Sequence, residues 1–408
     1  MRTVRVFISA AETSSDAHGA ELLKELKKQT QSRGWELEAF GMGGPKLRAE
    51  GLNAVVDSGE MLVMGFSEIL GRLVRIIRAL GELQMAVKVS RPDIAVVIDY
   101  PDFHFRLARR IKKLGVPLVY YIPPKVWAWR KGRIHFLKAT FKKILCILPF
   151  EKDFYEKENV PALYVGNPLV DELPKAMSQE EAKERLGIEI EKRVIVLLVG
   201  SRPHELKVHL APMIKGAASA ALALQKEKPG PVQIRISLPQ GMGEKIAETA
   251  EALFLKLNVS QYGIELVISH GDAHLCMLAS KGGVIKSGTS TLEAALLGLP
   301  HVVVYRPSWL STFIIRKVIG YKKAVGLVNL VAGKQEDKKD LVTELISGDM
   351  THGNIERELA KVLIDQRVRS RMKKGFAEIS KKISPSFLNG PPSEVCATEI
   401  LALIKDVQ

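Results

Sequence analysis

The chain is poor in cysteine: its 408 residues include Cys146, Cys276 and Cys396, which lie far apart. An odd, widely spaced set provides neither a disulfide framework nor a thiolate metal site, and it suits a reducing compartment. The sequence also lacks the Gly-x-Ser-x-Gly elbow, the Walker phosphate loop and the glycine-rich dinucleotide fingerprint. Hydrolase, nucleoside-triphosphatase and dehydrogenase functions therefore lack the loops on which they depend.

Acidic residues are absent between Phe103 and Phe150, so most of the net charge of +15 lies in that tract. The basic residues there are Arg106, Arg109, Arg110, Lys112, Lys113, Lys125, Arg130, Lys131, Arg133, Lys138, Lys142 and Lys143. Such a tract attracts nucleic acid, an anionic membrane surface or a phosphorylated substrate. No helix-turn-helix, zinc-finger, RRM or KH pattern accompanies the charge, so we expect no nucleic-acid partner. A solvated basic face without a partner is the alternative.

Residues 61–80 form a long apolar stretch, but Glu68, Arg72, Arg75 and Arg78 interrupt it, which argues against a transmembrane span. The three arginines are spaced three residues apart and share one helix face. This pattern fits an amphipathic helix at a lipid interface or acyl-chain groove, and it fits a core helix with an exposed arginine edge equally well. The first apolar run, residues 4–10, is short and β-branched, as in a core strand rather than a signal peptide.

Short β-branched runs alternate with helix-like segments along the chain, which predicts βαβ units on parallel sheets. The predicted strands are residues 4–10, 37–42, 94–100, 118–122, 144–148 and 163–165, then 194–199, 232–238, 264–269, 284–287 and 302–305. The fold class is therefore α/β, with two Rossmann-like domains whose strand ends face a central cleft. We place the first domain at residues 1–168, completed by C-terminal helices at 365–408, and the second at 169–364.

The most informative stretch joins a predicted strand to a helix through Ser287, Gly288, Thr289 and Ser290, with Glu293 one turn later. The N–H groups and the positive dipole end of a helix favour phosphate oxygens, and Glu293 could accept hydrogen bonds from ribose hydroxyls. The pattern predicts a nucleotide-sugar site. An ordinary helix cap is the alternative, because Ser290 and Glu293 also fit a capping box.

Gly200, Ser201 and Arg202 follow another predicted strand of the same sheet and end at the same edge. Glycine lets the backbone approach a ligand, serine supplies a short donor, and arginine can bind two oxygens at once. Three such residues after a strand are a weak signal alone. Together with the first turn they indicate a diphosphate site.

Asp99 and Asp102 end the predicted strand at 94–100 and project toward the same kind of edge. A carboxylate there can act as a general base if burial raises its pKa toward neutrality. We assign that role to Asp99 and expect Asp102 to cap the next helix, as we expect of Asp272. His270 and His274 lie beside Asp272 where a predicted strand gives way to a helix, and His204 and His209 have no third ligand nearby, so we expect no metal site.

A series of motif blocks occurs in order along nearly the whole chain. The blocks are Glu12-Thr13-Ser14-Ser15-Asp16-Ala17-His18-Gly19-Ala20, Gly41-Met42-Gly43-Gly44-Pro45, Met64-Gly65 with Glu68, Asp99-Tyr100-Pro101-Asp102-Phe103, Val126-Trp127-Ala128-Trp129-Arg130, Leu148-Pro149-Phe150-Glu151, Gly200-Ser201-Arg202 with Glu205, residues 287–293, and Asn329-Leu330 with Ala332-Gly333. In this series the chain resembles the lipid-A-disaccharide synthase family, glycosyltransferases of family 19 with the two-domain GT-B fold.

The resemblance implies that UDP-2,3-diacylglucosamine donates its sugar to the 6-hydroxyl of 2,3-diacylglucosamine 1-phosphate, with inversion and release of UDP. Asp99 would be the base. The nucleotide-sugar site would comprise Gly200, Ser201, Arg202, Glu205, Ser287, Gly288, Thr289, Ser290, Glu293 and Asn329. The acceptor side would comprise Glu12, Ser14, Asp16, Met64, Glu68, Asp102, Trp127 and Arg130. We expect no metal or other cofactor, because arginine and a helix N-terminus can stabilise the departing diphosphate.

The resemblance also implies a cytoplasmic enzyme bound peripherally to the anionic inner membrane, and a homodimer that exchanges C-terminal segments. The chain departs from the family pattern at five positions: Ala11 and Ser15 replace glycines, Pro123 a serine, Asn167 a histidine and Ser347 a glutamine. The first two changes favour an alternative GT-B enzyme with another substrate, such as a UDP-sugar epimerase or a different lipid-acceptor transferase. A non-catalytic membrane-surface binding protein is a third hypothesis.

Overall fold

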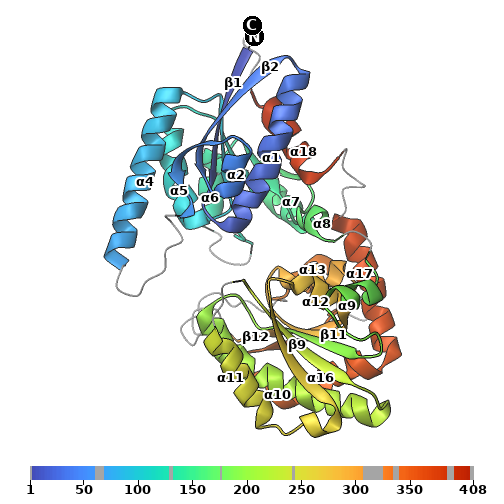
Figure 1. The fold of residues 1–408 in the computed structure, drawn as a ribbon. Helices are drawn as coiled ribbons and strands as arrows, with labels where there is room; N and C mark the ends of the chain where they lie inside the picture. Colours follow the sequence, from blue (N-terminus) through green and yellow to red (C-terminus); the bar gives the residue numbers. More distant parts are fainter. Residues whose placement is uncertain are drawn as a thin grey trace. The chain divides into compact units, whose positions relative to one another are not determined.

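The computed structural model describes residues 2–59, 69–127, 132–174, 177–240, 244–306, 325–333, 340–383 and 390–404. The chain forms two compact units (Figure 1). The first contains Met1–Asp171 and Ile383–Gln408, and the second contains Glu172–Lys382. Each unit has its own parallel sheet and hydrophobic core, as expected for the predicted GT-B fold class.

The first unit is built on a seven-stranded parallel sheet in the order β3-β2-β1-β4-β5-β6-β7. The strands are β1 (Arg2–Ala10), β2 (Trp35–Gly43), β3 (Asn53–Asp57), β4 (Ile94–Ile98), β5 (Leu118–Tyr121), β6 (Lys143–Cys146) and β7 (Ala162–Tyr164). The strand order reverses between β1 and β4, which pair from Val6 with Ile94 to Ala10 with Ile98. The loops after these two strands diverge there, and that position is where ligands bind in open α/β sheets.

Helices cover both faces of this sheet. One core contains residues of α4 (Ile69–Ser90), α5 (Pro101–Lys112), α6 (Arg133–Thr140) and α7 (Pro149–Lys157). The other contains residues of α1 (Thr13–Ser32), α2 (Pro45–Ala49) and α18 (Pro392–Ala402), so a C-terminal helix completes the first unit. The short helix α8 (Leu169–Glu172) lies at the boundary with the second unit.

The second unit repeats the topology with six parallel strands in the order β10-β9-β8-β11-β12-β13. They are β8 (Arg193–Leu198), β9 (Val232–Leu238), β10 (Ile264–His270), β11 (Ser280–Lys286), β12 (His301–Tyr305) and β13 (Glu344–Ile346). The order reverses between β8 and β11, whose register pairs Ile285 with Leu198. The loops after β8 and β11 therefore diverge at a second switch point.

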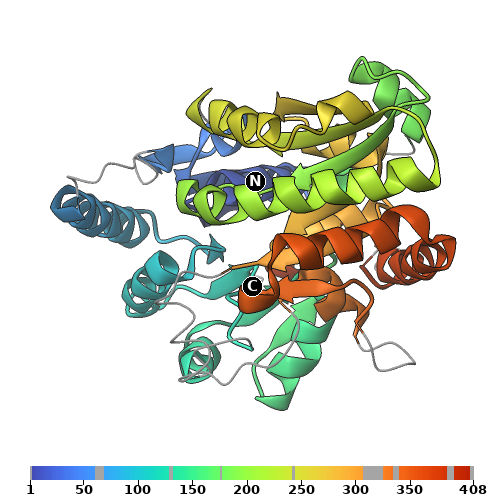
Figure 2. The same ribbon diagram turned by 90° about the horizontal axis from the view of Figure 1, so that it is seen from below.

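Its helices also form two layers. A core on one face includes residues of α12 (Ala273–Ala279) and α13 (Ser290–Leu296), and α9 (Gln179–Arg185) packs against α12. On the other face, α10 (Pro203–Glu227) and α16 (His352–Ile364) lie side by side (Figure 2), near α11 (Glu244–Leu255). The remaining helices are α15 (Leu327–Ala332) and α17 (Gln366–Ile383), with short 3-10 turns at Ser260–Tyr262 and Ser347–Asp349.

The chain returns to the first unit at Ile383, later than the predicted residue 365, because α17 packs on the second unit. The Phe376 ring stacks on His301 of β12 with centroids 5.6 Å apart. Lys382 Nζ donates to the Ala332 carbonyl at 3.1 Å. Among the described residues of the predicted C-terminal helical segment, α18 belongs to the first unit (Figure 1).

The predicted apolar helix at 61–80 is described only from Ile69, where α4 begins, and α4 continues to Ser90. Residues 60–68 lie outside the described part of the chain, as do the side chains of residues 69–73. Leu80, Leu83 and Val87 of α4 are buried in the core, while Val74, Ile77, Met85 and Val89 are exposed. Within the described residues, no helix has the length and apolar character to cross a membrane.

Candidate active site

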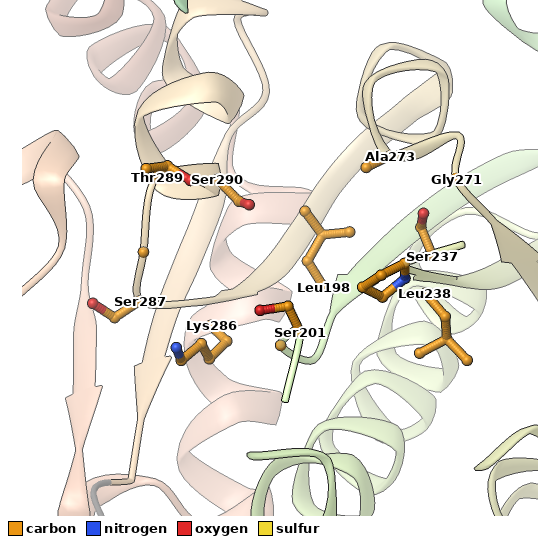
Figure 3. A pocket seen from close by; sticks show the side chains of 13 residues that line it. Leu198, Ser201, Ser237, Leu238, Gly271, Ala273, Lys286, Ser287, Thr289 and Ser290 are labelled. Atoms are coloured by element: carbon orange, nitrogen blue, oxygen red, sulfur yellow. The ribbon is translucent and has the colours of Figure 1, made fainter. Parts of the chain in front are cut away.

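A pocket of about 260 Å³ lies at the switch point of the second unit (Figure 3). Loops after four strands supply its walls, and the lining residues are Leu198, Gly200, Ser201, Ser237, Leu238, Pro239, Gly271, Ala273, Lys286, Ser287, Gly288, Thr289 and Ser290. These residues are mostly small, and five of them carry hydroxyl groups, beside the apolar side chains of Leu198, Leu238 and Pro239. The structure thus brings the two predicted turns, at residues 200–201 and 287–290, into one pocket.

The turn after β11 differs from the capping box that was the alternative. Thr289 is the N-cap of α13, Ser290 is already helical, and no side chain caps this end. Ser287 Oγ donates to the Val325 carbonyl at 3.0 Å, which fixes the start of the turn. Glu293 Oε2 lies 3.1 Å from His274 Nε2 of α12, so its carboxylate is paired within the unit and does not line the pocket.

The turn after β8 depends on glycine. Gly200 has φ +120°, and a Cβ atom there would lie 2.7 Å from Glu205 Oε2. That carboxylate oxygen accepts the Ser201 backbone N–H at 3.2 Å. Glu205 therefore shapes the turn from behind rather than lining the pocket. Arg202 is the N-cap of α10, its side chain is 66% exposed, and its Nη1 lies 3.7 Å from Glu205 Oε1.

Lys286 is a pocket residue that the sequence reasoning missed. It is the last residue of β11, and its Nζ bonds Glu205 Oε1 at 2.6 Å and lies 5.7 Å from the Tyr305 ring centroid. Burial alone would raise the pKa of Glu205, but Lys286, the Ser201 N–H and the charge of Arg202 together lower it. The ion pair places the Lys286 side chain at the pocket wall. Its signal in the sequence was its place one residue before the Ser287 turn.

Asp272 shapes the opposite wall. It occupies the N-cap position of α12, but its side chain does not cap the helix, which corrects the prediction. Asp272 Oδ1 instead accepts hydrogen bonds from Ser269 Oγ at 2.9 Å, Ser237 Oγ at 3.2 Å and Cys276 Sγ at 3.3 Å. These bonds join β9, β10 and α12 next to Gly271 and Ala273, which line the pocket.

Asn329 lies apart from the pocket lining, in a buried network. Its Nδ2 donates to the Val342 carbonyl at 2.9 Å and to Glu344 Oε1 at 2.8 Å, and its Oδ1 accepts the Val342 N–H at 3.0 Å. Glu344 also accepts the N–H groups of Val325 and Gly326. Burial raises the pKa of Glu344. The described position of Asn329 thus holds α15 against β13.

Ligand-type side chains do not gather in the part of the chain that the structure describes: it holds no cluster of three or more His, Cys, Asp or Glu residues suited to a metal. His209 is buried, and burial lowers its pKa. Its Nδ1 donates to the Glu205 carbonyl at 2.6 Å and its Nε2 accepts the Arg306 N–H at 3.1 Å. Both ring nitrogens therefore serve the fold.

Asp99 follows β4 at the switch point of the first unit. It has φ +53° and is followed by Tyr100 at φ +44°, a left-handed pair of residues that both carry side chains. Burial raises the pKa of Asp99, and the charges of Lys125 and His18 act in the opposite direction. A carboxylate with a raised pKa on a constrained turn has the properties required of a general base.

Two of the predicted acceptor residues have structural partners. Asp16 is buried, and its carboxylate accepts the N–H groups of Gly44 at 2.7 Å, Lys46 at 3.0 Å and Leu47 at 3.2 Å, so it caps α2. Asp102 does not cap α5, which corrects the prediction. It lies in the first turn of α5, 73% exposed, and its Oδ1 is 2.6 Å from Arg133 Nη2.

Of the other predicted acceptor residues, Ser14 is exposed, Glu12 and Trp127 are half-buried, and the rest lie outside the described residues. Glu12 is the N-cap of α1, and Ser14 is exposed. Trp127 Nε1 donates to Glu151 Oε1 at 2.9 Å, and burial raises the pKa of Glu151 to about 7. The predicted positions Met64, Glu68 and Arg130 lie outside the described residues.

Several departures from the family pattern point into the protein. Ala11 is packed in the core. The buried Ser15 Oγ accepts the Glu12 N–H and donates to the Glu12 carbonyl, both at 2.9 Å. Pro123 is buried, and Asn167 Oδ1 accepts the Leu169 N–H at 3.1 Å. These four substitutions therefore add no side chain to an open surface, whereas Ser347 lies half-buried with φ +56° after β13.

Comparisons with known proteins agree on one family. A profile described as lipid-A-disaccharide synthetase matches residues 6–389. The lipid-A-disaccharide synthase of Myxococcus xanthus (strain DK1622) is 37% identical over 379 residues, which cover 93% of each chain. Among solved structures, the UDP-GlcNAc 2-epimerase of Neisseria meningitidis, bound to UDP-GlcNAc, has a TM-score of 0.56 at 13% identity and covers 99% of both chains.

The calicheamicin glycosyltransferase CalG4 has a TM-score of 0.54 at 14% identity, over 100% of this chain and 99% of its own. An epimerase and a transferase match equally well in structure, so these two likenesses establish the GT-B fold alone. The family profile and the sequence relatives establish more. The chain belongs to the lipid-A-disaccharide synthase family and is a hexosyltransferase.

Proposed function

We propose that the chain transfers the sugar of UDP-2,3-diacylglucosamine to the 6-hydroxyl of 2,3-diacylglucosamine 1-phosphate, with inversion at the anomeric carbon. The observation that carries this proposal is the pocket at the β8/β11 switch point, formed by the two turns that match the family's nucleotide-sugar motifs. The lipid-A-disaccharide synthases among the relatives support the substrate pair. UDP and the disaccharide 1-phosphate are then the products.

The second unit would hold the diphosphate of the donor. Ser201, Thr289 and Ser290 provide hydroxyl and backbone donors along the pocket wall, and Lys286 provides a fixed cation. Such donors stabilise the negative charge that grows on the leaving diphosphate. Arg202, whose exposed side chain follows the turn after β8, can add a bidentate contact to the diphosphate. We assign no direct ligand contact to Asn329 or Glu205, because both are engaged within the protein.

Asp99 of the first unit would be the base. It takes the proton from the acceptor 6-hydroxyl as that oxygen forms a bond to the anomeric carbon, and the bond to the diphosphate oxygen breaks with its electron pair on UDP. One base opposite the leaving group accounts for inversion. Burial, which raises the pKa of Asp99, brings its proton affinity closer to what a base needs at neutral pH.

An assay of UDP release and disaccharide formation with the two acylated sugars tests the proposal. Asp99→Asn should lower kcat on the order of 10²- to 10⁴-fold while UDP binding to the second unit is retained. Because the raised pKa belongs to a base, activity should rise with pH through an acidic limb above the ordinary range of a carboxyl group.

Asp93→Asn is the matched control, because Asp93 precedes β4, binds the Arg5 N–H at the opposite end of the strand, and is far from the switch point. Disaccharide formation at an unchanged rate by Asp99→Asn would refute the base assignment. UDP binding without any disaccharide from the unmodified protein would refute the substrate pair. A UDP-sugar epimerase would then convert the donor alone, which mass spectrometry of the sugar detects.

We also propose that the enzyme works on the cytoplasmic face of the inner membrane, with α4 as the contact. Val74, Ile77, Met85 and Val89 are between 54% and 74% exposed along this helix, beside basic residues. Apolar and basic groups together suit an anionic lipid surface. Binding to anionic vesicles should weaken as salt rises, and Ile77→Glu should reduce it severalfold. If this surface joins two copies instead, light scattering will show that Ile77→Glu changes the mass and leaves vesicle binding intact.

A further inference from the structure

The peptide of Asp99 is held by side chains from two other elements. Its carbonyl oxygen lies 2.6 Å from His104 Nδ1 of α5 and accepts a hydrogen bond from Tyr120 Oη of β5 at 2.9 Å. Its N–H donates to the Tyr121 carbonyl at 3.0 Å. Both backbone polar atoms of Asp99 are therefore occupied, and its carbonyl oxygen has two side-chain partners. A residue with a side chain rarely adopts this conformation unless its surroundings fix it.

The chemistry of the carbonyl determines the tautomer of His104. A carbonyl only accepts, so Nδ1 carries the hydrogen and Nε2 is the acceptor. Ser9 Oγ of β1 lies 2.9 Å from that Nε2, which makes Ser9 its donor. Burial lowers the pKa of His104 to about 4, so the ring is neutral at neutral pH. Burial also raises the pKa of Tyr120 well above its ordinary value, so its hydroxyl keeps its proton.

Both donors are thus available over the whole neutral range, and both converge on one carbonyl oxygen. Packing alone would not require them. The rings of His104 and Tyr120 lie 6.4 Å apart in a T-shaped contact, within an aromatic cluster that also includes Phe103 and Phe105. Phenylalanine or leucine could fill such positions. The polar atoms of these two side chains therefore have a purpose beyond filling the core.

We propose that His104 and Tyr120 are positioning residues that hold the Asp99 peptide in its left-handed conformation and keep the carboxylate in place for proton abstraction. The inference rests on the proposed role of Asp99 as the base. Ser9 acts one step further away, since it stabilises the tautomer that His104 needs. The network joins β1, β5 and α5 to the end of β4, which are the elements around the switch point of the first unit.

Substitutions at His104 separate its two nitrogens. Asparagine places a side-chain N–H where Nδ1–H was, and glutamine places a polar group nearer the former Nε2. We expect His104→Asn to keep kcat within a few fold, and we expect His104→Gln and Tyr120→Phe each to lower it about tenfold, since small misplacements of a catalytic group are costly. Tyr164→Phe is the control, because Tyr164 lies on β7 and its Oη donates to the carbonyl of Ile383, at the end of α17.

A second readout separates positioning from general destabilisation. If Asp99 relaxes toward solvent, its pKa falls toward the ordinary value, so the acidic limb of the pH profile of kcat should shift to lower pH in Tyr120→Phe and His104→Gln. UDP binding should be unchanged, because the proposed nucleotide pocket lies in the other unit. Lys125 and His18, the charged groups that act on Asp99, are unaltered in all these variants.

The results distinguish this inference from the proposed function. If Asp99→Asn abolishes turnover while Tyr120→Phe and His104→Gln match Tyr164→Phe in kcat and pH profile, the positioning role is refuted and the base stands. If His104→Gln is as active as His104→Asn, the carbonyl contact is not what matters and the inference fails. If Asp99→Asn is fully active, the base assignment itself is wrong.

Discussion

In the first unit the chain leaves the switch point through residues with side chains, whereas in the second it does so through glycine and small hydroxyl residues. Asp99 and Tyr100 after β4, and Ile122 after β5, all have positive φ. In the second unit, the turn after β11, the counterpart of β4, contains Ser287 and Gly288, and the turn after β8, the other strand at the switch point, contains Gly200 at φ +120°. The two sheets share one topology, so the difference lies in the turns rather than in the architecture.

The two solutions have different consequences. At Asp99 a network of side-chain donors compensates for an unfavourable backbone conformation, and the result is one carboxylate in a constrained position. At Gly200 the absence of a side chain lets Glu205 approach the turn from behind, and the result is an open pocket of about 260 Å³. Under the proposed function, the turn of the first unit holds the base in one position, and the turns of the second unit leave room for the donor.

Lys286→Met would test whether the second unit binds by charge as well as by shape. Loss of the ammonium group should weaken UDP binding about tenfold, because the diphosphate loses a charge-assisted contact. Uridine, which lacks phosphates, should bind as before. Isothermal titration calorimetry with UDP and uridine measures both effects.

Lys192→Met is the matched control. Lys192 is as buried as Lys286, at 17% against 16% side-chain exposure, and its Nζ pairs with Glu265 Oε1 at 3.0 Å, away from the pocket lining. If Lys286→Met weakens uridine and UDP equally, the lysine maintains the shape of the pocket through Glu205. The two units would then differ in how firmly each turn is held in shape, and not in the charge that each offers to a ligand.

The sequence predicted the fold well because buried parallel strands are continuous apolar runs. All eleven predicted strands are present. In the described part of the chain, two strands were missed, and both are short: β3 (Asn53–Asp57) is an edge strand with exposed alternate residues, and β13 (Glu344–Ile346) is a three-residue edge strand. Neither has the apolar run on which the prediction depends. The position of α17 was missed because it depends on long-range contacts with the second unit, which the local sequence pattern does not reveal.

The site was predicted less completely, because a motif does not reveal where a side chain points. The two turns around the pocket were found from their glycines and hydroxyls. Asp16 and Asn329 belong to motif blocks, yet their polar atoms bind the protein's own backbone. Lys286 and His104 were overlooked, since one ends a strand and the other lies in a tract read as a basic surface. Only the fold brings His104 to the carbonyl of Asp99.

Ser15→Gly restores the glycine usual in the family, and of these variants it should change activity least. It would show whether the residues that hold Asp99 in place are the full extent of the rigid part of the first unit. Ser15 Oγ satisfies the Glu12 N–H at the start of α1, so its loss should cost about 1 kcal/mol of stability, measured by urea unfolding. Because the side chain is 1% exposed and faces the helix cap, kcat and the choice of acceptor should stay within twofold. A changed acceptor preference would mean that the start of α1 takes part in recognition. Rigidity in the first unit would then extend beyond the residues that hold Asp99, and the substitution in this chain would be a determinant of substrate choice rather than an internal adjustment of the cap.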